Sequence, residues 1–202
     1  MSFHPYRKEV LEAIARRTIL EYDPCLLCEP CAIPVELIIE KRFDLTLEYH
    51  YIRKNGRVLG ETVFLDTSVP IFNAETQSYE LTPVKGGTII VDAGLLNSRS
   101  DGRLRYTCAH ELAHWLIHKE IYCSSGETAA MTKTLRSSEA DANMERQADR
   151  LSSYLLMPGG LVKKAFYSAA CLPGDSINAL SEQFGVSCQA MKIRLTEMRL
   201  VD

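Results

Sequence analysis

Apolar side chains recur with a helical period in several stretches of the chain. In residues 5–20 they fall roughly on one side of a helix, at Val10, Leu11, Ile14 and Leu20. A second short helix is expected in "VELIIEKRF", which Pro34 can open at its first position. Another is expected in "NMERQADRLSSYLLMP", where Pro158 stops it. Ser100 or Asp101 can cap one more helix, the one that contains three histidines.

Two other stretches have the composition of strands. Residues 45–66 contain two alternating, β-rich runs that meet at Asn55-Gly56, the dipeptide that best tolerates the positive φ angles of a tight turn. They predict a β-hairpin. "GGTIIVDAG", residues 86–94, predicts one more strand. The order of helix, small sheet and helix predicts an α+β fold with a short mixed sheet.

Composition limits the class of protein. The 202 residues, 46% hydrophobic and 24% charged, suit one globular domain with a small appendage. We expect a main domain over residues 1–160 and a C-terminal helical subdomain over 161–202. The formal charge of -3 gives no general attraction to nucleic acid or anionic membranes. No apolar run resembles a signal or a membrane anchor, so we expect a soluble, cytoplasmic protein. Residues 120–143 suggest a mobile connection.

The segment "YTCAHELAHWLIHK" contains the chain's most specific chemistry. His110 and His114 are four residues apart, so on a helix both project from one face and can bind one metal ion. Glu111 lies beside them, where a carboxylate can take a proton from metal-bound water without being a ligand. The flanking residues are apolar and bury this helix, and buried histidines need partners. The spacing therefore predicts a metal site with its own general base.

A catalytic zinc site needs a third protein ligand. His118 lies two turns from His110, roughly 12 Å along a straight helix, which is too far for both to bind one ion. It is better assigned to packing or to orienting a ligand. Glu145 is the better candidate, because Asp149, one turn further on, can accept a hydrogen bond from a ligand histidine. Glu139 and Asp141 are rival carboxylates nearby.

These motifs resemble those of a known family. "HELAHWLIH", followed about thirty residues later by "ERQADRLSSYLLMP" and preceded by "IPVELIIEKRF", is similar to the ImmA/IrrE family of bacterial metallopeptidases over residues 33–158. The resemblance implies a small zincin-like fold. It also implies a site-specific endopeptidase that cleaves a helix-turn-helix transcriptional repressor and so derepresses a mobile element or a stress regulon. The insertion-like segment 121–142 is a departure that affects the shape of the substrate cleft.

The resemblance also assigns roles by position. His110, His114 and Glu145 match the family's metal ligands, and Glu111 matches its catalytic acid. Asp149 stands where many relatives have asparagine, a change that preserves hydrogen-bond acceptance. Zinc is the expected ion, although two histidines and a glutamate would also accept manganese.

The expected mechanism is the attack of activated water on a peptide carbonyl. An extended substrate strand would add to the sheet edge, and residues 86–94 are the expected edge. Side chains suited to stabilising the oxyanion are Tyr106, Tyr122, Arg136 and Tyr154. Nothing in the sequence selects one of them, and ordinary packing or surface placement is preferred for each.

A cysteine cluster offers a second chemistry. Cys25, Cys28 and Cys31 have a spacing that can direct sulfur to one zinc ion or iron-sulfur cluster. The ferredoxin-type continuation is missing, so free thiols in a Pro-bounded loop are favoured over a cluster. A cluster, if formed, would sense redox state and gate the protease.

The C-terminal segment "INALSEQFGVSCQAMKIRLTEM" is similar to a helix-turn-helix. It has apolar Leu180 and Phe184, a turn at Gly185, a cap at Ser187, and then apolar Met191 and Leu195. Its acidic and basic residues balance, so packing or repressor docking is favoured over DNA binding. The alternative function is therefore a non-catalytic, metal-containing regulator that binds DNA or a repressor.

Overall fold

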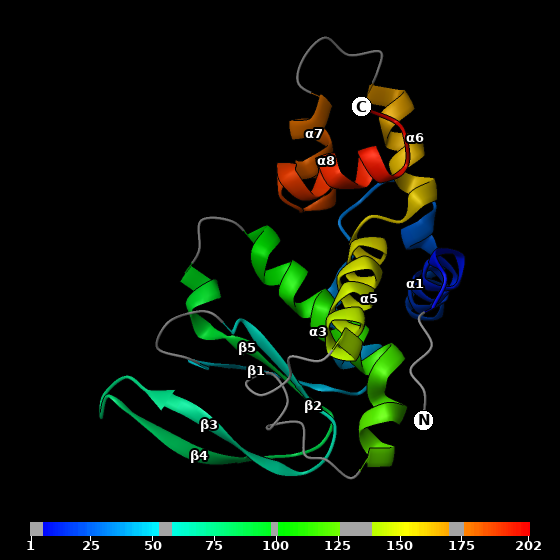
Figure 1. Ribbon diagram of the computed structural model, residues 1–202. Coiled ribbons are helices and arrows are strands. Elements are labelled where there is room, and N and C mark those ends of the chain that lie inside the picture. The colour runs from blue at the N-terminus through cyan, green and yellow to red at the C-terminus, as the bar shows by residue number, and fades with distance from the viewer. Residues whose placement is uncertain (1–5, 53–57, 98–100, 126–138, 170–175) are drawn as a thin grey trace.

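A small mixed sheet lies between a layer of helices and a β-hairpin (Figure 1). The computed structural model describes the backbone of residues 6–52, 58–97, 101–125, 139–169 and 176–202. Within those ranges the side chains of residues 101, 125, 139–141 and 169 are excluded from the description.

The helices agree with the apolar periodicity. Those of the main body are α1 (Lys8–Tyr22), α2 (Val35–Leu37), which continues as a π-helix (Ile38–Arg42), α3 (Asp101–Ser125) and α5 (Glu139–Leu156). The C-terminal ones are α6 (Gly159–Ala169), α7 (Ser176–Phe184) and α8 (Cys188–Glu197). The prediction of a mobile connection over residues 120–143 is wrong at both ends, because α3 extends to Ser125 and α5 begins at Glu139. Ser100 lies outside the described residues.

The three-stranded sheet has a different pairing from the one predicted. Its order is β1 (Thr46–His50), β5 (Thr88–Asp92), β2 (Gly60–Val63), with β5 parallel to β1 and antiparallel to β2. The predicted hairpin between β1 and β2 is therefore wrong, since β5 lies between them. The Asn55-Gly56 turn lies outside the described residues.

The position of β5 corrects a second expectation. All five of its residues are buried, and Ile89, Ile90 and Val91 are fully inaccessible to solvent. Such a continuous apolar strand is most stable with a strand on each side and a layer on each face. Residues 88–92 are thus the centre of the sheet, and the prediction that this segment is an edge for substrate addition is wrong.

A hairpin that was not predicted is formed by β3 (Thr67–Asn73) and β4 (Ser78–Val84). Pro70 and Pro83 argue against central strands, but a two-stranded ribbon has only edges, where proline is tolerated. The Asn73 side chain shapes the turn, since its Oδ1 accepts hydrogen bonds from the backbone amides of Glu75 and Thr76.

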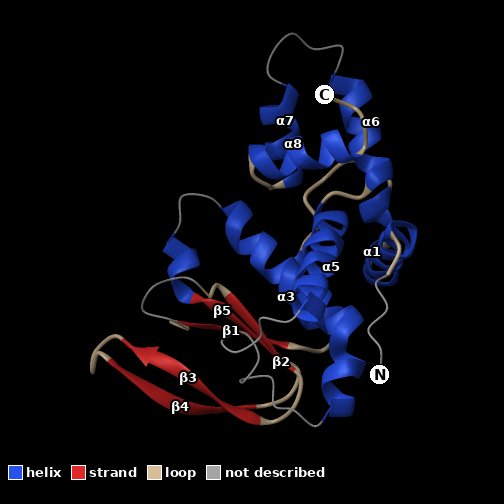
Figure 2. Ribbon diagram, in the orientation of Figure 1, coloured by secondary structure: helices blue, strands red, loops and turns tan. Residues whose placement is uncertain are grey.

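Helices lie on one side of the sheet and the β3–β4 hairpin on the other (Figure 2). Both faces of the sheet are buried. On one face, Ile89 and Val91 join the main hydrophobic cluster that includes residues of α1, α3 and α5. On the other face, Ile90 and Val63 pack in a smaller cluster with Val69 of the β3–β4 hairpin. Residues that alternate along a strand point to opposite faces, so β2 directs Gly60 and Thr62 toward α3 and Val63 toward the hairpin.

The C-terminal helices α7 and α8 are joined at Gly185, whose φ of 62° requires the left-handed conformation that glycine adopts readily. Ser187 caps α8, because its side chain accepts a hydrogen bond from the Ala190 amide. The apolar residues predicted in both helices are buried in the main cluster: Leu180, Phe184, Met191 and Leu195. The division of the chain at residue 160 remains a prediction.

Arg194 anchors α8 to the rest of the protein. Its side chain is fully buried, with its guanidinium bound to Glu12 at 3.1 Å and to Glu197 at 3.0 Å. Nε donates to the Met157 carbonyl oxygen, and the guanidinium stacks over the Tyr154 ring.

Replacing Arg194 is expected to destabilise the protein. Arg194→Met should lower the free energy of unfolding by ~2 kcal/mol, because it removes the guanidinium hydrogen bonds to Glu12, Glu197 and the Met157 carbonyl oxygen, and a hydrogen bond that involves a charged group contributes ~1.5–3 kcal/mol. Urea denaturation measures the loss. The control is Lys192→Met on an exposed position of the same helix, which should change little. An equal, small effect of both changes would contradict the anchoring role.

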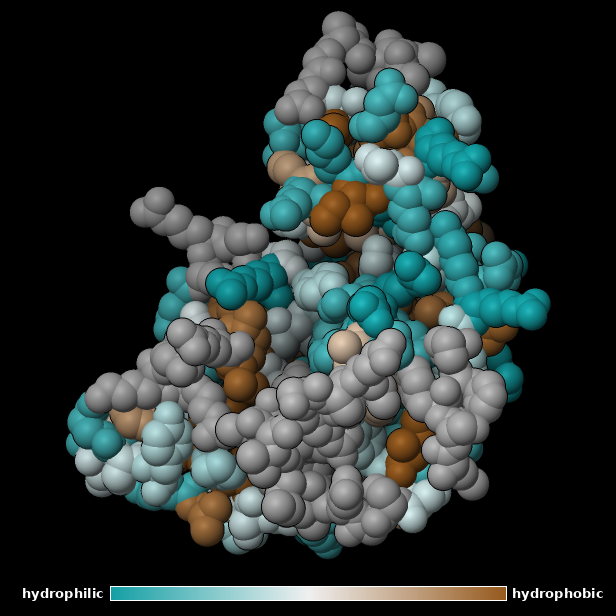
Figure 3. Space-filling view, in the orientation of Figure 1, coloured by the Kyte–Doolittle hydropathy of each residue, from teal (hydrophilic) through white to brown (hydrophobic). Residues whose placement is uncertain are grey.

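None of the helices in the described part of the chain is long and apolar enough to cross a membrane. The face in Figure 3 is mostly hydrophilic over the described residues, with apolar side chains in small, separate patches.

Candidate metal centre

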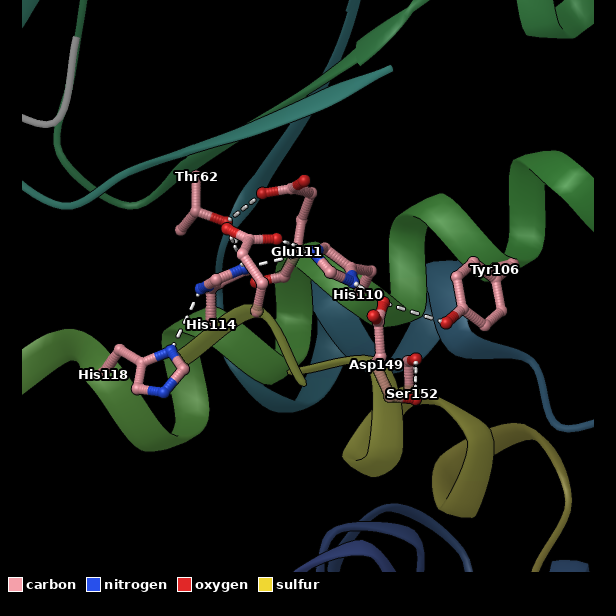
Figure 4. A network of polar contacts seen from close by, with 9 residues as sticks. Thr62, Tyr106, His110, Glu111, His114, His118, Asp149 and Ser152 are labelled. Atoms are coloured by element: carbon pink, nitrogen blue, oxygen red, sulfur yellow. Dashed lines mark hydrogen bonds and ion pairs between the residues drawn. The ribbon is translucent and has the colours of Figure 1, made fainter. Parts of the chain in front are cut away.

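Three potential metal donors converge between α3 and α5 (Figure 4). His110 and His114 lie one turn apart on α3, and their Nε2 atoms are 3.1 Å apart. Glu145 of α5 brings Oε2 to 3.2 Å from His110 Nε2 and Oε1 to 3.4 Å from His114 Nε2. These donor atoms all lie within 4.8 Å of one another, and among the described residues no other set of three meets this criterion.

Small buried residues lie close to the donors along both helices. Ala109 and Ala113 of α3 and Ala148 of α5 are fully buried in the main cluster. Small side chains permit close helix packing, and α3 packs extensively against α5. The helices can therefore present their polar side chains to one point.

The far nitrogen of His110 has an acidic partner. Its Nδ1 lies 3.0 Å from Oδ1 of Asp149, which also accepts a hydrogen bond from the Tyr106 hydroxyl at 3.0 Å. Burial alone would raise the pKa of Asp149, but the hydrogen bond and charge of His110 and the Tyr106 hydroxyl hold it below its ordinary value. An ionised Asp149 places the His110 ring hydrogen on Nδ1 and leaves a lone pair on Nε2.

His114 has a different partner. Its Nδ1 lies 3.0 Å from Nδ1 of His118, which is fully buried. Burial, assisted by the charge of His114, lowers the pKa of His118 to about 3, so this ring is neutral at ordinary pH. A neutral His118 can accept the hydrogen of His114 Nδ1, which fixes the ring and again leaves a lone pair on Nε2. This geometry fits an orienting role for His118.

The donor set fits a divalent cation. With both ring hydrogens on Nδ1, two nitrogen lone pairs and a carboxylate face one another, an arrangement of acceptors alone. A single proton can bridge only one pair of these atoms, whereas a metal ion binds all three. Two histidines and one glutamate are also a donor set found at catalytic zinc sites.

Glu111 lies outside this donor set and is almost completely buried, with 2% of its surface exposed. The Thr62 hydroxyl of β2 lies 2.9 Å from Glu111 Oε2 and also 2.9 Å from the Glu111 carbonyl oxygen (Figure 4). Thr62 was not singled out from the sequence. The alternation of side chains along β2 points Thr62 toward α3. Which face of the strand lies toward α3 can be assigned only when the strand pairing is known.

The three tyrosines that are chemically suited to stabilising the oxyanion have other contacts. The Tyr106 hydroxyl binds Asp149, and the Tyr122 ring stacks on Phe64 with centroids 4.5 Å apart. The Tyr154 hydroxyl donates to Glu197 at 2.6 Å. Arg136 lies outside the described residues, as do the side chains of the rival acids Glu139 and Asp141.

Cys25, Cys28 and Cys31 do not form a three-donor group in the structure. Cys25 and Cys28 are exposed and Cys31 is half-buried. The Sγ atoms of Cys28 and Cys31 lie 3.9 and 3.8 Å from the backbone oxygens of Pro24 and Leu26. The charge of Asp23 raises the pKa of Cys25, and burial raises that of Cys31. Neither shift favours the thiolate form that binds metal.

Asp149 gives a test of the orienting network. Asp149→Ala should weaken zinc binding roughly 10–100-fold, because the loss of such a partner frees the ligand ring. Asp149→Asn is the matched control and should retain most of the affinity, since its amide oxygen can still accept from His110 Nδ1. Competition with a chromophoric chelator measures both. Equal affinities for the wild type and Asp149→Ala would exclude the proposed orientation.

An α+β fold with a His/His/Glu donor set between two helices is consistent with a small metallopeptidase domain. A family model described as the IrrE N-terminal-like domain matches residues 94–196, just over half of the chain. The chain therefore belongs to the ImmA/IrrE family of metallopeptidases, as its motifs indicate. Family membership implies a metal, usually zinc. A comparison with curated proteins gives no match.

A solved structure has a similar fold. A transcriptional regulator of Mycobacterium tuberculosis aligns with a TM-score of 0.54 and 15% sequence identity over 93% of this chain. The alignment covers 55% of the regulator, so this chain spans little more than half of that protein's length. At this identity the match supports the fold alone.

Proposed function

We propose that this protein is a zinc-dependent, site-specific endopeptidase that cleaves a helix-turn-helix transcriptional repressor and so derepresses a mobile element or a stress regulon. The observation that carries the proposal is the convergence of His110, His114 and Glu145, together with Glu111, which follows His110 on α3 and whose buried carboxylate contacts Thr62 outside the donor set. A purely structural metal site has no use for that second carboxylate.

The chain's own residues supply the parts that hydrolysis needs. His110, His114 and Glu145 would hold the ion, with Asp149 and His118 fixing the two imidazoles. When bound, zinc lowers the pKa of a water molecule and polarises a peptide carbonyl. Manganese would suit the same donors.

Glu111 would carry the proton. Its carboxylate accepts a proton from the attacking water as the new carbon–oxygen bond forms. It then returns that proton to the leaving amine as the carbon–nitrogen bond breaks, so the carboxylate is regenerated. The buried position of Glu111 suits this role, because a fixed base beside the reacting atoms needs little reorganisation.

The proposed substrate follows from the family and not from the geometry of the site. The resemblance to the ImmA/IrrE family implies cleavage of a repressor. A peptidase that cleaves such a substrate needs narrow specificity. The three metal donors do not select a substrate, so this specificity must come from surfaces outside the donor set.

The experiment is direct incubation with the candidate repressor. The zinc-loaded protein and the repressor encoded next to its gene are mixed, and fragments are identified by mass spectrometry. We expect one or a few defined cuts that disappear with a chelator and return with zinc. An intact repressor in the presence of stoichiometric bound zinc would contradict the proposal.

The alternative function is a regulator that binds DNA or a repressor without cleaving it. The α7–α8 pair with its Gly185 turn and Ser187 cap favours it. However, Arg194, one of the few basic residues of this pair, is fully buried and bound to Glu12 and Glu197, so it is not available to phosphates. Peptidase activity is therefore better supported than DNA binding.

A further inference from the structure

Strand β2 packs against α3 and contacts the candidate general base, Glu111. Gly60 and Thr62 are two residues apart on this strand and face α3, where Glu111 is buried. We propose that both are positioning residues, which together set the direction of the Glu111 carboxylate. The proposal rests on the proposed function insofar as it concerns catalysis, but the packing that it describes can be tested without a substrate.

Thr62 holds the carboxylate by a hydrogen bond. Its hydroxyl is 2.9 Å from Glu111 Oε2, and Thr62 itself is only 5% exposed. The hydroxyl has one hydrogen and lies equally close to Oε2 and to the carbonyl oxygen of Glu111. Because either oxygen can accept this hydrogen, the Thr62 side chain is held beside Glu111. A hydrogen bond to a charged group in a site shielded from water is among the stronger ones in proteins.

Gly60 provides the space that the Glu111 side chain occupies. A Cβ atom on Gly60 would lie 2.7 Å from both Cγ and Oε1 of Glu111 and 2.8 Å from Cγ2 of Thr107. These distances are shorter than van der Waals contacts, so the carboxylate or the strand would have to move.

The backbone of Gly60 gives no other reason for glycine. Its φ lies outside the left-handed region, whereas Gly87 and Gly185 lie within it. Glycine weakens a strand, and inside a strand it often marks the close approach of another group. Here that group is the Glu111 side chain, so position 60 is explained by the general base and not by a turn.

The hydrogen bond is tested by two changes of Thr62. Thr62→Val keeps the shape but removes the hydroxyl, and it should lower kcat about tenfold while leaving KM unchanged. Thr62→Ser keeps the hydroxyl and should retain most of the wild-type kcat. The zinc content should be unchanged in both, because neither touches a ligand. The control is Thr46→Val on the exposed part of β1.

Two results would overturn the role of Thr62. One is a kcat for Thr62→Val equal to that of Thr46→Val. The other is an equal loss of kcat in Thr62→Ser and Thr62→Val, which would mean that the hydroxyl is not what matters.

The space at Gly60 is tested by a double-mutant cycle on the metal-free protein. Gly60→Ala should lower Tm by roughly 5 °C, because extra atoms in a packed interior force displacement. In a Glu111→Ala background the same change should lower Tm much less, since the Cγ and Oε1 contacts are gone. Thr107→Ser removes only the Cγ2 methyl contact. It should therefore reduce the smaller part of the Tm loss, the part that remains in the Glu111→Ala background.

This cycle separates the two proposals. Melting needs neither zinc nor repressor, so coupling between positions 60 and 111 would support the packing even if no repressor were cleaved. Equal Tm losses from Gly60→Ala in the wild-type and Glu111→Ala backgrounds would overturn the role of Gly60. If Gly60→Ala does not fold, folding of the Gly60→Ala/Glu111→Ala double variant supports the role, and its failure to fold overturns it.

Discussion

Glu111→Gln is expected to reduce repressor cleavage by about 10²–10⁴-fold, the usual contribution of a general acid–base residue. Glutamine is almost the same size as glutamate and can still accept a hydrogen bond from Thr62. It cannot take a proton from water or return one to the leaving amine. The loss should fall on kcat, because the substrate and the metal contact other atoms.

Two measurements make this result specific. The zinc content of Glu111→Gln should equal that of the wild type, since Glu111 lies outside the His110, His114 and Glu145 set. The matched control is Glu120→Gln, an exposed position on the same helix, which should cleave at the wild-type rate. Cleavage by Glu111→Gln at the wild-type rate would exclude Glu111 as the base and would favour a different proton acceptor.

The alternative function gives the opposite expectation. A non-catalytic regulator would bind its partner equally well with glutamate or glutamine at position 111, and neither form would produce fragments. Repressor binding by both forms without fragments would therefore favour the regulator.

The convergence of the donors could be predicted because it depends on local spacing. His110 and His114 need only a continuous helix to lie one turn apart, and the apolar residues around them predict that helix. Glu145 and Asp149 follow the same rule on a second helix. The two helices had only to pack together, which their small and apolar residues favour.

The sheet could not be predicted in the same way, because strand pairing is not local. Asn55-Gly56 indicates a turn, but it does not say whether the strands on either side pair with each other. The buried run of β5 decides this by taking the central position between them. The sequence of the β3–β4 hairpin did not indicate strands, because it contains Pro70 and Pro83, and only edge strands tolerate proline.

The contacts of Glu111 depend on that pairing. Thr62 and Gly60 are about fifty residues from Glu111 in the sequence, and only the position of β2 beside α3 brings them together. A threonine and a glycine in a strand carry no functional signal of their own. The candidate general base, Glu111, could therefore be proposed from the sequence, whereas its contacts with Thr62 and Gly60 could not.

Glu145→Gln is expected to weaken zinc binding by more than about 100-fold, a larger loss than removal of an orienting partner causes. Glutamine fills the same space but brings no negative charge to the two imidazole nitrogens, which are 3.1 Å apart. His110 and His114 then remain as a two-ligand site, and a catalytic zinc site normally has three protein ligands.

The thermal stability of the protein gives an independent measure of this loss. A ligand that binds only the folded state at about 100 times its Kd stabilises a protein by roughly 2.7 kcal/mol. Zinc should therefore raise the Tm of the wild type by several degrees and raise that of Glu145→Gln far less. Asp141→Asn tests the rival acid on the same helix and should keep the wild-type response. If Asp141→Asn loses the zinc response and Glu145→Gln keeps it, the third ligand is misassigned, even though Glu145 lies 3.2 Å from His110 Nε2 and 3.4 Å from His114 Nε2.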